Sequence, residues 1–306
     1  MLPEEIKVSV LEMLASLHAE PVNIEGVSPA GGGCINTAFR LDSAAGVYFM
    51  KYNDAGRYPG MFESEARGLR LLQGHVGVAS RAPADGSMAI SVPSVIGCGA
   101  AGRYSLLVLE YLESGSMRGD FWEVFGRGLA ALHRHTNGYF GLDHPNYIGS
   151  LPQSNDAHGG WTDFFIVQRL EPQLRLARDS GRADRELVQG FQDLYRHLSD
   201  LFPEEPPALL HGDLWSGNYM VGADGGPAII DPAVYYGHRY MDIGMSKLFG
   251  GFSHSFYEAY NQAYAMENNW REAIEVANLY PLMVHVNLFG GGYPGSVKAI
   301  LKRYRR

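Results

Sequence analysis

The sequence predicts an α+β fold with a smaller N-terminal part built on an antiparallel sheet and a larger, mainly helical C-terminal part. Three observations carry this prediction. Up to residue 112, short apolar runs alternate with glycine-rich turns, which is typical of strands and hairpins. After residue 113, apolar residues recur at helical spacing. The 306 residues suffice for two such parts with their own cores, so we place lobes at 1–112 and 113–306.

Composition and charge restrict the class of partner. The chain has 33 acidic and 25 basic residues, for a formal charge of −8, which argues against nucleic acid as the main partner. Neither a signal peptide nor an apolar run long enough to span a membrane is expected. Two cysteines, Cys34 and Cys98, are too few for a disulfide framework and indicate a reducing compartment such as the cytoplasm.

The N-terminal part is predicted to begin with a helix over residues 3–18 and a strand over residues 21–27. A glycine run and a return strand over residues 36–41 follow. The run comprises Gly31, Gly32 and Gly33. Backbone amides of such a loop can approach a triphosphate closely, although an ordinary hairpin turn is the common alternative. The pattern is not a Walker-type phosphate loop, because G-x-x-x-x-G-K-[ST] is missing.

The next two elements place a lysine and a glutamate where a nucleotide site would need them. Residues 47–51 are predicted to form a strand that ends in Lys51, and residues 59–73 a helix that carries Glu65. In kinases a strand lysine paired with a helix glutamate grips the α- and β-phosphates of ATP. Glu63 competes with Glu65 for this role, and either side chain alone could simply be solvated.

A second glycine pattern, G-x-G-x-x-G at residues 97–102, is interpreted as a hairpin turn. A dinucleotide site would require this pattern to open a helix, whereas residues 103–110 are predicted to form a strand. That strand runs to the boundary between the two parts. There the backbone of Glu110 and Leu112 is predicted to bond an adenine ring.

Helices dominate the C-terminal part. They are predicted over residues 120–133, 161–179, 185–201, 253–265, 270–288 and 295–305. Trp161 begins the second of these helices, and the sequence leaves open whether it belongs to the core or to a substrate wall.

The chemistry is concentrated between His211 and Asp231. His211, Asp213 and Asn218 have the H-x-D-x-x-x-x-N spacing of a kinase catalytic loop, and Asp231 follows an apolar pair on a turn. Phosphoryl transfer needs a base, which would be Asp213, and oxygen ligands for Mg²⁺, which would be Asn218 and Asp231. A hairpin between the two ligands would bring them together. The alternative is a turn-rich loop whose polar side chains only cap backbone groups.

These motifs resemble those of fructosamine kinases, also called ketosamine-3-kinases, within the protein-kinase-like and aminoglycoside-phosphotransferase-like group. The resemblance rests on residues 31–35, 49–51, 61–65, 148–155, 161–165, 210–218, 230–233, 236–238 and 248–252. The H-G-D-L-W-S-G-N string, with D-P-A and F-G-G-F, separates this family from choline and aminoglycoside kinases. Tyr240 stands where the family often has a Glu, and Asp242 is expected to brace the backbone of the catalytic loop.

The resemblance implies a two-lobed, protein-kinase-like fold and ATP-dependent phosphorylation of the 3-hydroxyl of ketosamines. The acceptor would be a ribulosamine or fructosamine, as a small molecule or as a glycated lysine on a protein. Its 3-phosphate is a good leaving group beside a carbonyl, so the product decomposes and releases the amine, which amounts to protein repair. Trp161 and Trp215 are candidate substrate contacts.

Two other functions and one regulatory device remain open at this point. The chain could be a kinase of the same fold that acts on an amino alcohol or an aminoglycoside, or a pseudokinase that only binds nucleotide. Cys34, directly after the glycine run, is a candidate redox switch, because an exposed thiol there could link two chains. The expected state is therefore a monomer or a redox-dependent homodimer.

Overall fold

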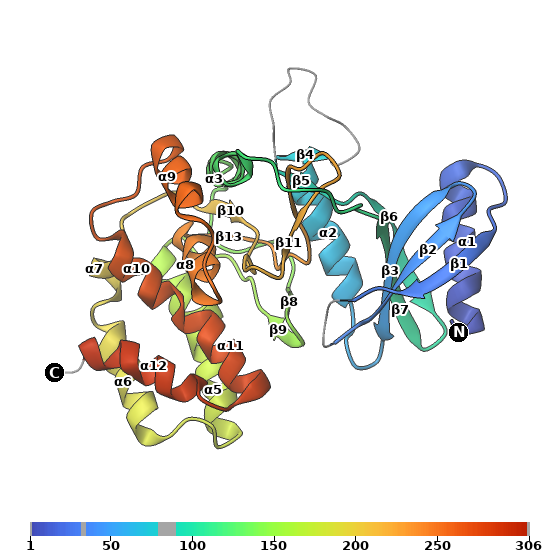
Figure 1. Cartoon of the computed structure of the whole chain (residues 1–306). Helices are drawn as coiled ribbons and strands as arrows, with labels where there is room; N and C mark the ends of the chain where they lie inside the picture. The colour runs from blue at the N-terminus through green and yellow to red at the C-terminus, as the bar shows by residue number, and fades with distance from the viewer. Residues whose placement is uncertain (1, 32–34, 79–89, 305–306) are drawn as a thin grey trace. The chain divides into compact units, whose positions relative to one another are not determined.

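The computed structural model describes residues 2–31, 35–78 and 90–304, which form two compact units. Unit 1 comprises Met1–Gly128 and Tyr219–Pro232, and unit 2 comprises Leu129–Asn218 and Ala233–Arg306. Unit 1 contains an antiparallel sheet, and unit 2 is mainly helical (Figure 1). The predicted α+β class is thereby confirmed.

Unit 1 is built on a five-stranded antiparallel sheet in the order β1-β2-β3-β7-β6. Its strands are β1 (Ile24–Pro29), β2 (Thr37–Ser43), β3 (Gly46–Asp54), β6 (Val95–Ala101) and β7 (Tyr104–Glu110). Two helices, α1 (Glu4–His18) and α2 (Met61–Gln73), contact β6. The α1 side chains Ile6, Val10 and Leu14 are buried against the sheet, so burial of one apolar helix face fixes α1 there.

A second, smaller sheet explains why a late segment of the chain belongs to unit 1. Its strand order is β11-β12-β5-β4. The strands are β4 (Gly77–Val78), β5 (Ser91–Val92), β11 (Tyr219–Val221) and β12 (Pro227–Ile229). The β11–β12 hairpin was predicted, but its parallel pairing with β5 was not. Tyr219 also packs on Phe121 and Phe125 of α3 (Phe121–Leu132), with ring centroids 5.9 and 5.7 Å away.

Unit 2 contains most of the helices. They are α4 (Trp161–Phe164), η1 (Phe165–Leu170), α5 (Glu171–Asp179), α6 (Arg185–Tyr195), α7 (Leu198–Leu201), α8 (Tyr240–Leu248), α9 (His254–Ala263), α10 (Trp270–Ala277), α11 (Leu279–Phe289), α12 (Tyr293–Leu301) and η2 (Lys302–Tyr304). Two short sheets accompany them. Their strands are β8 (Asn146–Ile148) with β9 (Leu151–Gln153), and β10 (Ala208–Leu210) with β13 (Tyr235–Gly237).

The structure corrects three expectations. Residues 97–102 lie mostly within β6, and the turn falls at Gly102, which has φ +59°. The predicted helix over 270–288 is two helices that meet at Asn278, and the one over 185–201 also divides into two. The division into lobes at residue 112 stays a prediction; in the structure α3 and the β11–β12 hairpin pack together in unit 1.

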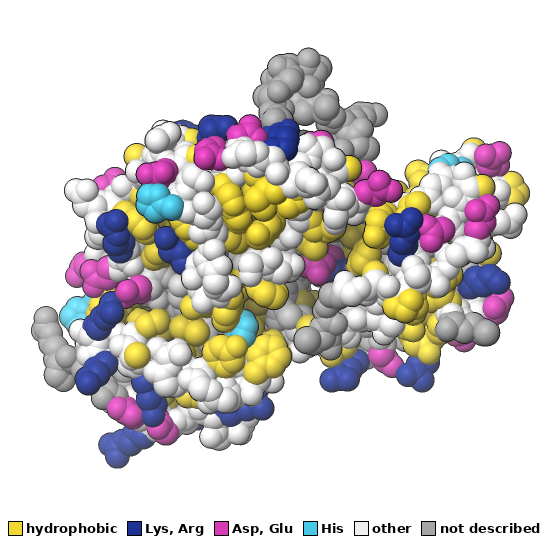
Figure 2. Space-filling model, viewed as in Figure 1, with side chains coloured by type: hydrophobic (Ala, Val, Ile, Leu, Met, Phe, Trp, Pro, Cys, Tyr) yellow, Lys and Arg dark blue, Asp and Glu magenta, His cyan; other side chains and the backbone are white. Residues whose placement is uncertain are grey.

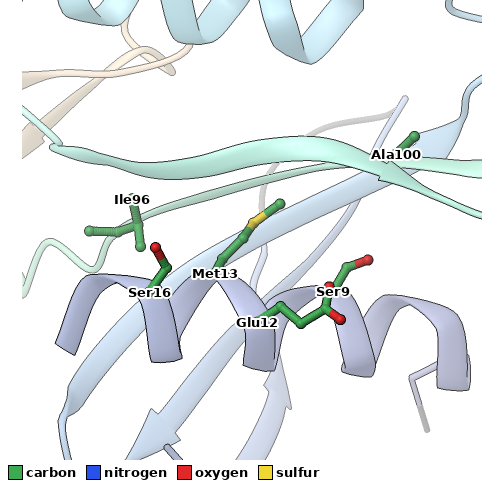
Figure 3. Close-up of a pocket in the computed structure, with 6 residues that line it drawn as sticks. All are labelled: Ser9, Glu12, Met13, Ser16, Ile96 and Ala100. Atoms are coloured by element: carbon green, nitrogen blue, oxygen red, sulfur yellow. The ribbon is translucent and has the colours of Figure 1, made fainter. Parts of the chain in front are cut away.

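Unit 1 has a hollow on its surface. A hollow of about 380 Å³ lies between α1 and β6, with Met13 pointing toward the strand (Figure 3). Gly97 makes room for this side chain, because a Cβ there would lie 2.8 Å from the Met13 sulfur.

Acidic and basic side chains are interspersed on the face drawn in Figure 2. Within the described residues, no helix is both long and apolar enough to cross a bilayer.

Candidate active site

In unit 1, Lys51 lies between two carboxylates. Its Nζ is 2.7 Å from Glu65 Oε1 and 2.7 Å from Asp231 Oδ1. Strand β3 brings the lysine inward, so that it is only 4% exposed, and α2 presents Glu65 to it. Glu63, which lies nearer the start of α2, is exposed instead. The ion pair that the sequence predicted is therefore made by Glu65.

Burial and neighbouring charges shift the pKa values of Lys51 and Glu65 for different reasons. Burial alone would lower the pKa of Lys51, but the charges of Asp231 and Glu65 outweigh it and raise that pKa above its ordinary value. Burial raises the pKa of Glu65 to about 7, against the pull of Lys51 and with a further push from Asp231. The lysine therefore stays cationic, while Glu65 is the easier of the two to neutralise.

We expect Glu65→Gln to remove a pH-dependent part of the stability. Because the pKa of Glu65 rises from 4.5 to about 7 on folding, the folded chain binds this proton more tightly. Its contribution to the free energy of unfolding is complete below about pH 4.5 and is lost as the pH rises through about pH 7. Urea unfolding of both proteins between about pH 5 and pH 8 should show the wild-type advantage shrinking. Glu63→Gln is the matched control, and a pH-independent difference for Glu65→Gln would contradict the shift.

In unit 2, Asp213 is held by Asn218. The Asn218 Nδ2 donates to Asp213 Oδ2 at 2.9 Å and to the Asp213 carbonyl at 2.8 Å. The loop is short and closed by its own backbone, since the Asn218 amide also donates to the Trp215 carbonyl. The amide nitrogen of the Asn218 side chain is thus used in orienting the carboxylate. Its carbonyl oxygen is the atom that this side chain can offer to a cation.

Asp242 fastens the same loop from behind, as the sequence led us to expect. Its two carboxylate oxygens accept from the backbone amides of His211 and Gly212, at 2.8 and 2.9 Å. His133 lies 3.1 Å from the carboxylate through Nε2 and 2.8 Å from the Tyr260 hydroxyl through Nδ1. Burial would raise the pKa of Asp242, but these partners lower it overall, so the brace remains ionised.

Two glycines of the loop lie close to neighbouring atoms, and at Gly212 those atoms belong to the backbone. Gly212 has φ +82°, and a Cβ there would lie 2.0 Å from the carbonyl oxygen of Ala233. The arginine that protein kinases carry at this position therefore has no room. A Cβ on Gly217 would lie 2.4 Å from the Trp215 ring. Packing against the Ala233 backbone therefore explains the glycine at position 212.

Asp231 has an unusual backbone. It has φ +52°, in the left-handed region that residues other than glycine seldom adopt, though Asp and Asn tolerate it best. Its hairpin pairs Tyr219 with Ile229, so Asn218 directly precedes one strand and Asp231 follows the other by two residues. That both residues share one metal ion remains a prediction, since the structure places them in different units.

The other predicted residues have mixed outcomes. Gly31 is exposed, while Gly32, Gly33 and Cys34 lie outside the described residues, so the redox switch stays a prediction. Glu110 ends β7, Leu112 lies two residues later, and the Glu110 amide donates to the Ser94 carbonyl at 2.8 Å. Their contacts with adenine stay a prediction.

The two candidate substrate tryptophans lie in different surroundings. Trp161 is 7% exposed and packs among rings of the core, with centroid distances of 5.1–5.8 Å. Those rings belong to Phe140, Phe164, Phe165, Phe202 and His238. This favours the core alternative for Trp161. Trp215 is partly exposed and packs edge-on against Phe249 at 6.2 Å, so it is the better candidate for a substrate contact.

Several buried polar residues have partners that the sequence did not reveal. His133 and Tyr260 support Asp242, and Arg239 makes a bidentate pair with Glu205, at 2.7 Å for each contact. Arg169 is fully buried beside Tyr235. The only available signal was a polar residue interrupting an otherwise apolar helical stripe, which does not reveal its partner.

Comparison with known proteins decides the family. A sequence model of the fructosamine kinase family matches residues 7–306. The chain belongs to the fructosamine kinase family. It is 36% identical over 299 residues to a probable ketoamine kinase of Synechocystis, covering 97% of this chain and 96% of that protein. It is 37% identical over 296 residues to the chloroplastic protein-ribulosamine 3-kinase of Arabidopsis thaliana, covering 94% of this chain and 85% of that protein.

Solved structures agree with this family and its fold. A Thermobifida fusca protein, assigned provisionally as a fructosamine-3-kinase, superposes with a TM-score of 0.83 at 31% identity, covering 97% of this chain and 98% of that one. An aminoglycoside phosphotransferase in complex with AMP-PNP and hygromycin B superposes with a TM-score of 0.63 at 16% identity, covering 96% and 98%. The second likeness establishes the kinase-like fold alone. The predicted membership of this family and of this fold group is confirmed.

Proposed function

We propose that this family member is an ATP-dependent kinase that phosphorylates the 3-hydroxyl of ketosamines and so promotes their removal from amines. The observation that carries the proposal is the buried Lys51 between Glu65 and Asp231, in a chain whose Asp213 is oriented by Asn218. The names of the relatives support the acceptor, since the plant proteins are called protein-ribulosamine 3-kinases and the bacterial ones ketoamine kinases.

In the proposed reaction, Asp213 accepts the proton of the attacking 3-hydroxyl. The oxygen then forms a bond to the γ-phosphorus of ATP, the bond from that phosphorus to the β-phosphate oxygen breaks, and ADP leaves. Asn218 keeps the carboxylate turned toward the acceptor, because its amide hydrogen fixes one of the two oxygens. Asp242 keeps the loop backbone in place, so the base is pre-positioned before the acceptor arrives.

The remaining site residues would hold ATP and Mg²⁺. Mg²⁺ prefers oxygen ligands, which the Asn218 carbonyl and the Asp231 carboxylate both supply, and when bound it would neutralise phosphate charge. Lys51 would grip the α- and β-phosphates, with Glu65 holding it in place. The glycine run of residues 31–33 would cover the phosphates, and the backbone of Glu110 and Leu112 would bond the adenine. These assignments follow the residue types and their contacts.

A panel of acceptors tests the proposal. We expect ATP consumption with ribulose-lysine or fructose-lysine, and a ³¹P NMR signal from a 3-phosphate that disappears as the amine is released. An aminoglycoside and an amino alcohol serve as competing acceptors. Phosphorylation of either competitor without either ketosamine would favour the related small-molecule kinase. Nucleotide binding without turnover on any acceptor would favour the pseudokinase.

Two further assays address the acceptor and the oligomeric state. Glycated lysozyme beside free ribulose-lysine would show whether protein-bound adducts are accepted. We propose a cytoplasmic enzyme, on the ground that two cysteines suit a reducing compartment. Gel filtration with and without oxidant would show whether the chain is a monomer or a redox-dependent dimer through Cys34.

A further inference from the structure

Arg169 is a fully buried arginine to which the proposed reaction assigns no role. It lies in η1, a single π-helical turn between α4 and α5, and its exposed fraction is 0%. Val167 of the same turn is 50% exposed. Such turns are rare, and they are frequently found at functional sites. Here the turn directs the guanidinium into unit 2.

The charge of Arg169 has no acidic partner. Across the described ranges 2–31, 35–78 and 90–304, no carboxylate lies within ion-pair distance of it. Its Nη1 donates to the Ser154 carbonyl at 2.6 Å and its Nη2 to Asn155 Oδ1 at 2.7 Å, while the Tyr235 ring lies 3.9 Å away. Arg239, equally buried, has Glu205 instead. A buried charge without a counter-ion is costly, so its neutral partners require an explanation.

The guanidinium sets the direction of a chain of side-chain amides. Arginine can only donate, so Asn155 must present its oxygen to Arg169 and its nitrogen elsewhere. That nitrogen donates to Asn146 Oδ1 at 3.0 Å. Asn146 therefore presents its own nitrogen on the other side, where it donates to the Val234 carbonyl at 2.8 Å. A single obligate donor thus decides which end of each amide faces the backbone.

Gln153 follows the same direction. Its Nε2 donates to Asn146 Oδ1 at 2.7 Å and to the Ala233 carbonyl at 3.3 Å. Its Oε1 accepts from the Tyr280 hydroxyl at 2.6 Å. All three amide side chains are buried, so water cannot reorient them. The carbonyls of Ala233 and Val234 each receive an amide hydrogen from this network.

Of these two residues, Ala233 lies directly against the backbone of the catalytic loop. The Ala233 amide donates to the His211 carbonyl at 2.9 Å. The Ala233 carbonyl is also the oxygen that leaves no room for a side chain at Gly212, the residue before Asp213. A shift of the Ala233 backbone would therefore be transmitted directly to the backbone that carries Asp213.

We propose that Arg169 is a positioning residue for Asp213, acting through the polarity of the Asn155–Asn146–Gln153 network. The proposal rests on the proposed function only for its activity assay. On this proposal, a substitute for Arg169 preserves activity only if it can donate hydrogen bonds and cannot accept them. Lys can still donate but cannot accept, Gln can turn either way, and Met can do neither.

Three variants test the proposal: Arg169→Lys, Arg169→Gln and Arg169→Met. We expect kcat to fall roughly 10- to 100-fold in the Gln and Met variants, as for other small misplacements of a reacting group, with the KM for ATP within about twofold. The Lys variant should recover most of kcat. Arg178→Met removes an exposed charge from the neighbouring helix and should change neither constant. Wild-type kcat in the Met variant, or equal losses in all three, overturns the proposal.

Two further measurements keep the test independent of folding and of the acceptor. Asn155→Asp can pair with Arg169 more strongly but cannot donate to Asn146, so kcat should fall even though the ion pair is stabilising; wild-type kcat would overturn the proposal. Hydrogen exchange of the Ala233 amide needs no acceptor. It should accelerate in the Gln and Met variants and not in the Lys variant, and unchanged exchange in all of them overturns the proposal. A wild-type chain inactive on every ketosamine would instead reject the proposed function.

Discussion

Asp213→Asn should lower kcat by roughly 10²- to 10⁴-fold while nucleotide binding persists, the range expected when a general base is removed. The substitution keeps the shape of the side chain. The amide that replaces the carboxylate can still turn its oxygen toward the Asn218 nitrogen, which lies 2.9 Å from the carboxylate in the wild type, so the loop should remain closed. What is lost is the ability to accept the proton of the acceptor hydroxyl. Steady-state kinetics and calorimetric titration with ATP would separate the two effects.

A matched control accompanies this variant. Asp163→Asn removes one exposed carboxylate from the same unit and should leave kcat unchanged. A kcat of Asp213→Asn within about threefold of the wild type would show that Asp213 is not the base, because removal of a general base should cost far more. A loss confined to the KM of the acceptor would likewise assign it to binding.

Asp231→Asn should abolish Mg²⁺-dependent turnover. Asn tolerates the left-handed backbone that Asp231 adopts at φ +52°, whereas Ala would add strain, so the Asn variant isolates the lost charge. Without the carboxylate, Asn218 offers the metal only a neutral oxygen, which is a weak ligand for a divalent cation. Lys51 loses one of its two partners but keeps Glu65, 2.7 Å away.

Metal titrations check this prediction. Turnover of the wild type should rise and saturate with Mg²⁺, and that of Asp231→Asn should stay at background across the same range. ATP binding without metal should persist in both proteins, because it depends on Lys51 and the backbone. Asp120→Asn, an exposed carboxylate of unit 1, is the control. Saturable, wild-type activity in Asp231→Asn would place the metal elsewhere.

Local pattern and motif spacing predicted most of the fold. The α2 helix, the β11–β12 hairpin and the catalytic loop occur where they were expected, and the strand that carries Lys51 does too, although it runs on to Asp54. In these elements apolar residues recur at a regular period, or motif residues stand at a fixed spacing, within a short stretch of sequence. Nearby residues are therefore enough to predict them. The choice between Glu63 and Glu65 could not be made in this way, because both flank the apolar face of the helix and only the strand decides.

Features that depend on distant residues were not predictable. Strand β5 has two residues, too few for a pattern, and its partner β12 comes far later in the chain. The π-helical turn lies inside the segment that was predicted as one regular helix over residues 161–179, and it carries the buried Arg169. Trp161 illustrates the same limit, since aromatic residues of the core and of a substrate wall share one sequence pattern.

The close approach of Gly212 to Ala233 means that the catalytic loop and the segment after Asp231 can be exchanged between proteins only together. Any side chain at Gly212 would collide with the Ala233 carbonyl. The path of the backbone after Asp231 therefore permits only glycine at the position before Asp213. A chimera that imports the loop of another kinase, with its arginine, would have to import the following segment as well. A recombination library between this chain and a kinase with arginine at this position should therefore place no crossover between residues 211 and 235.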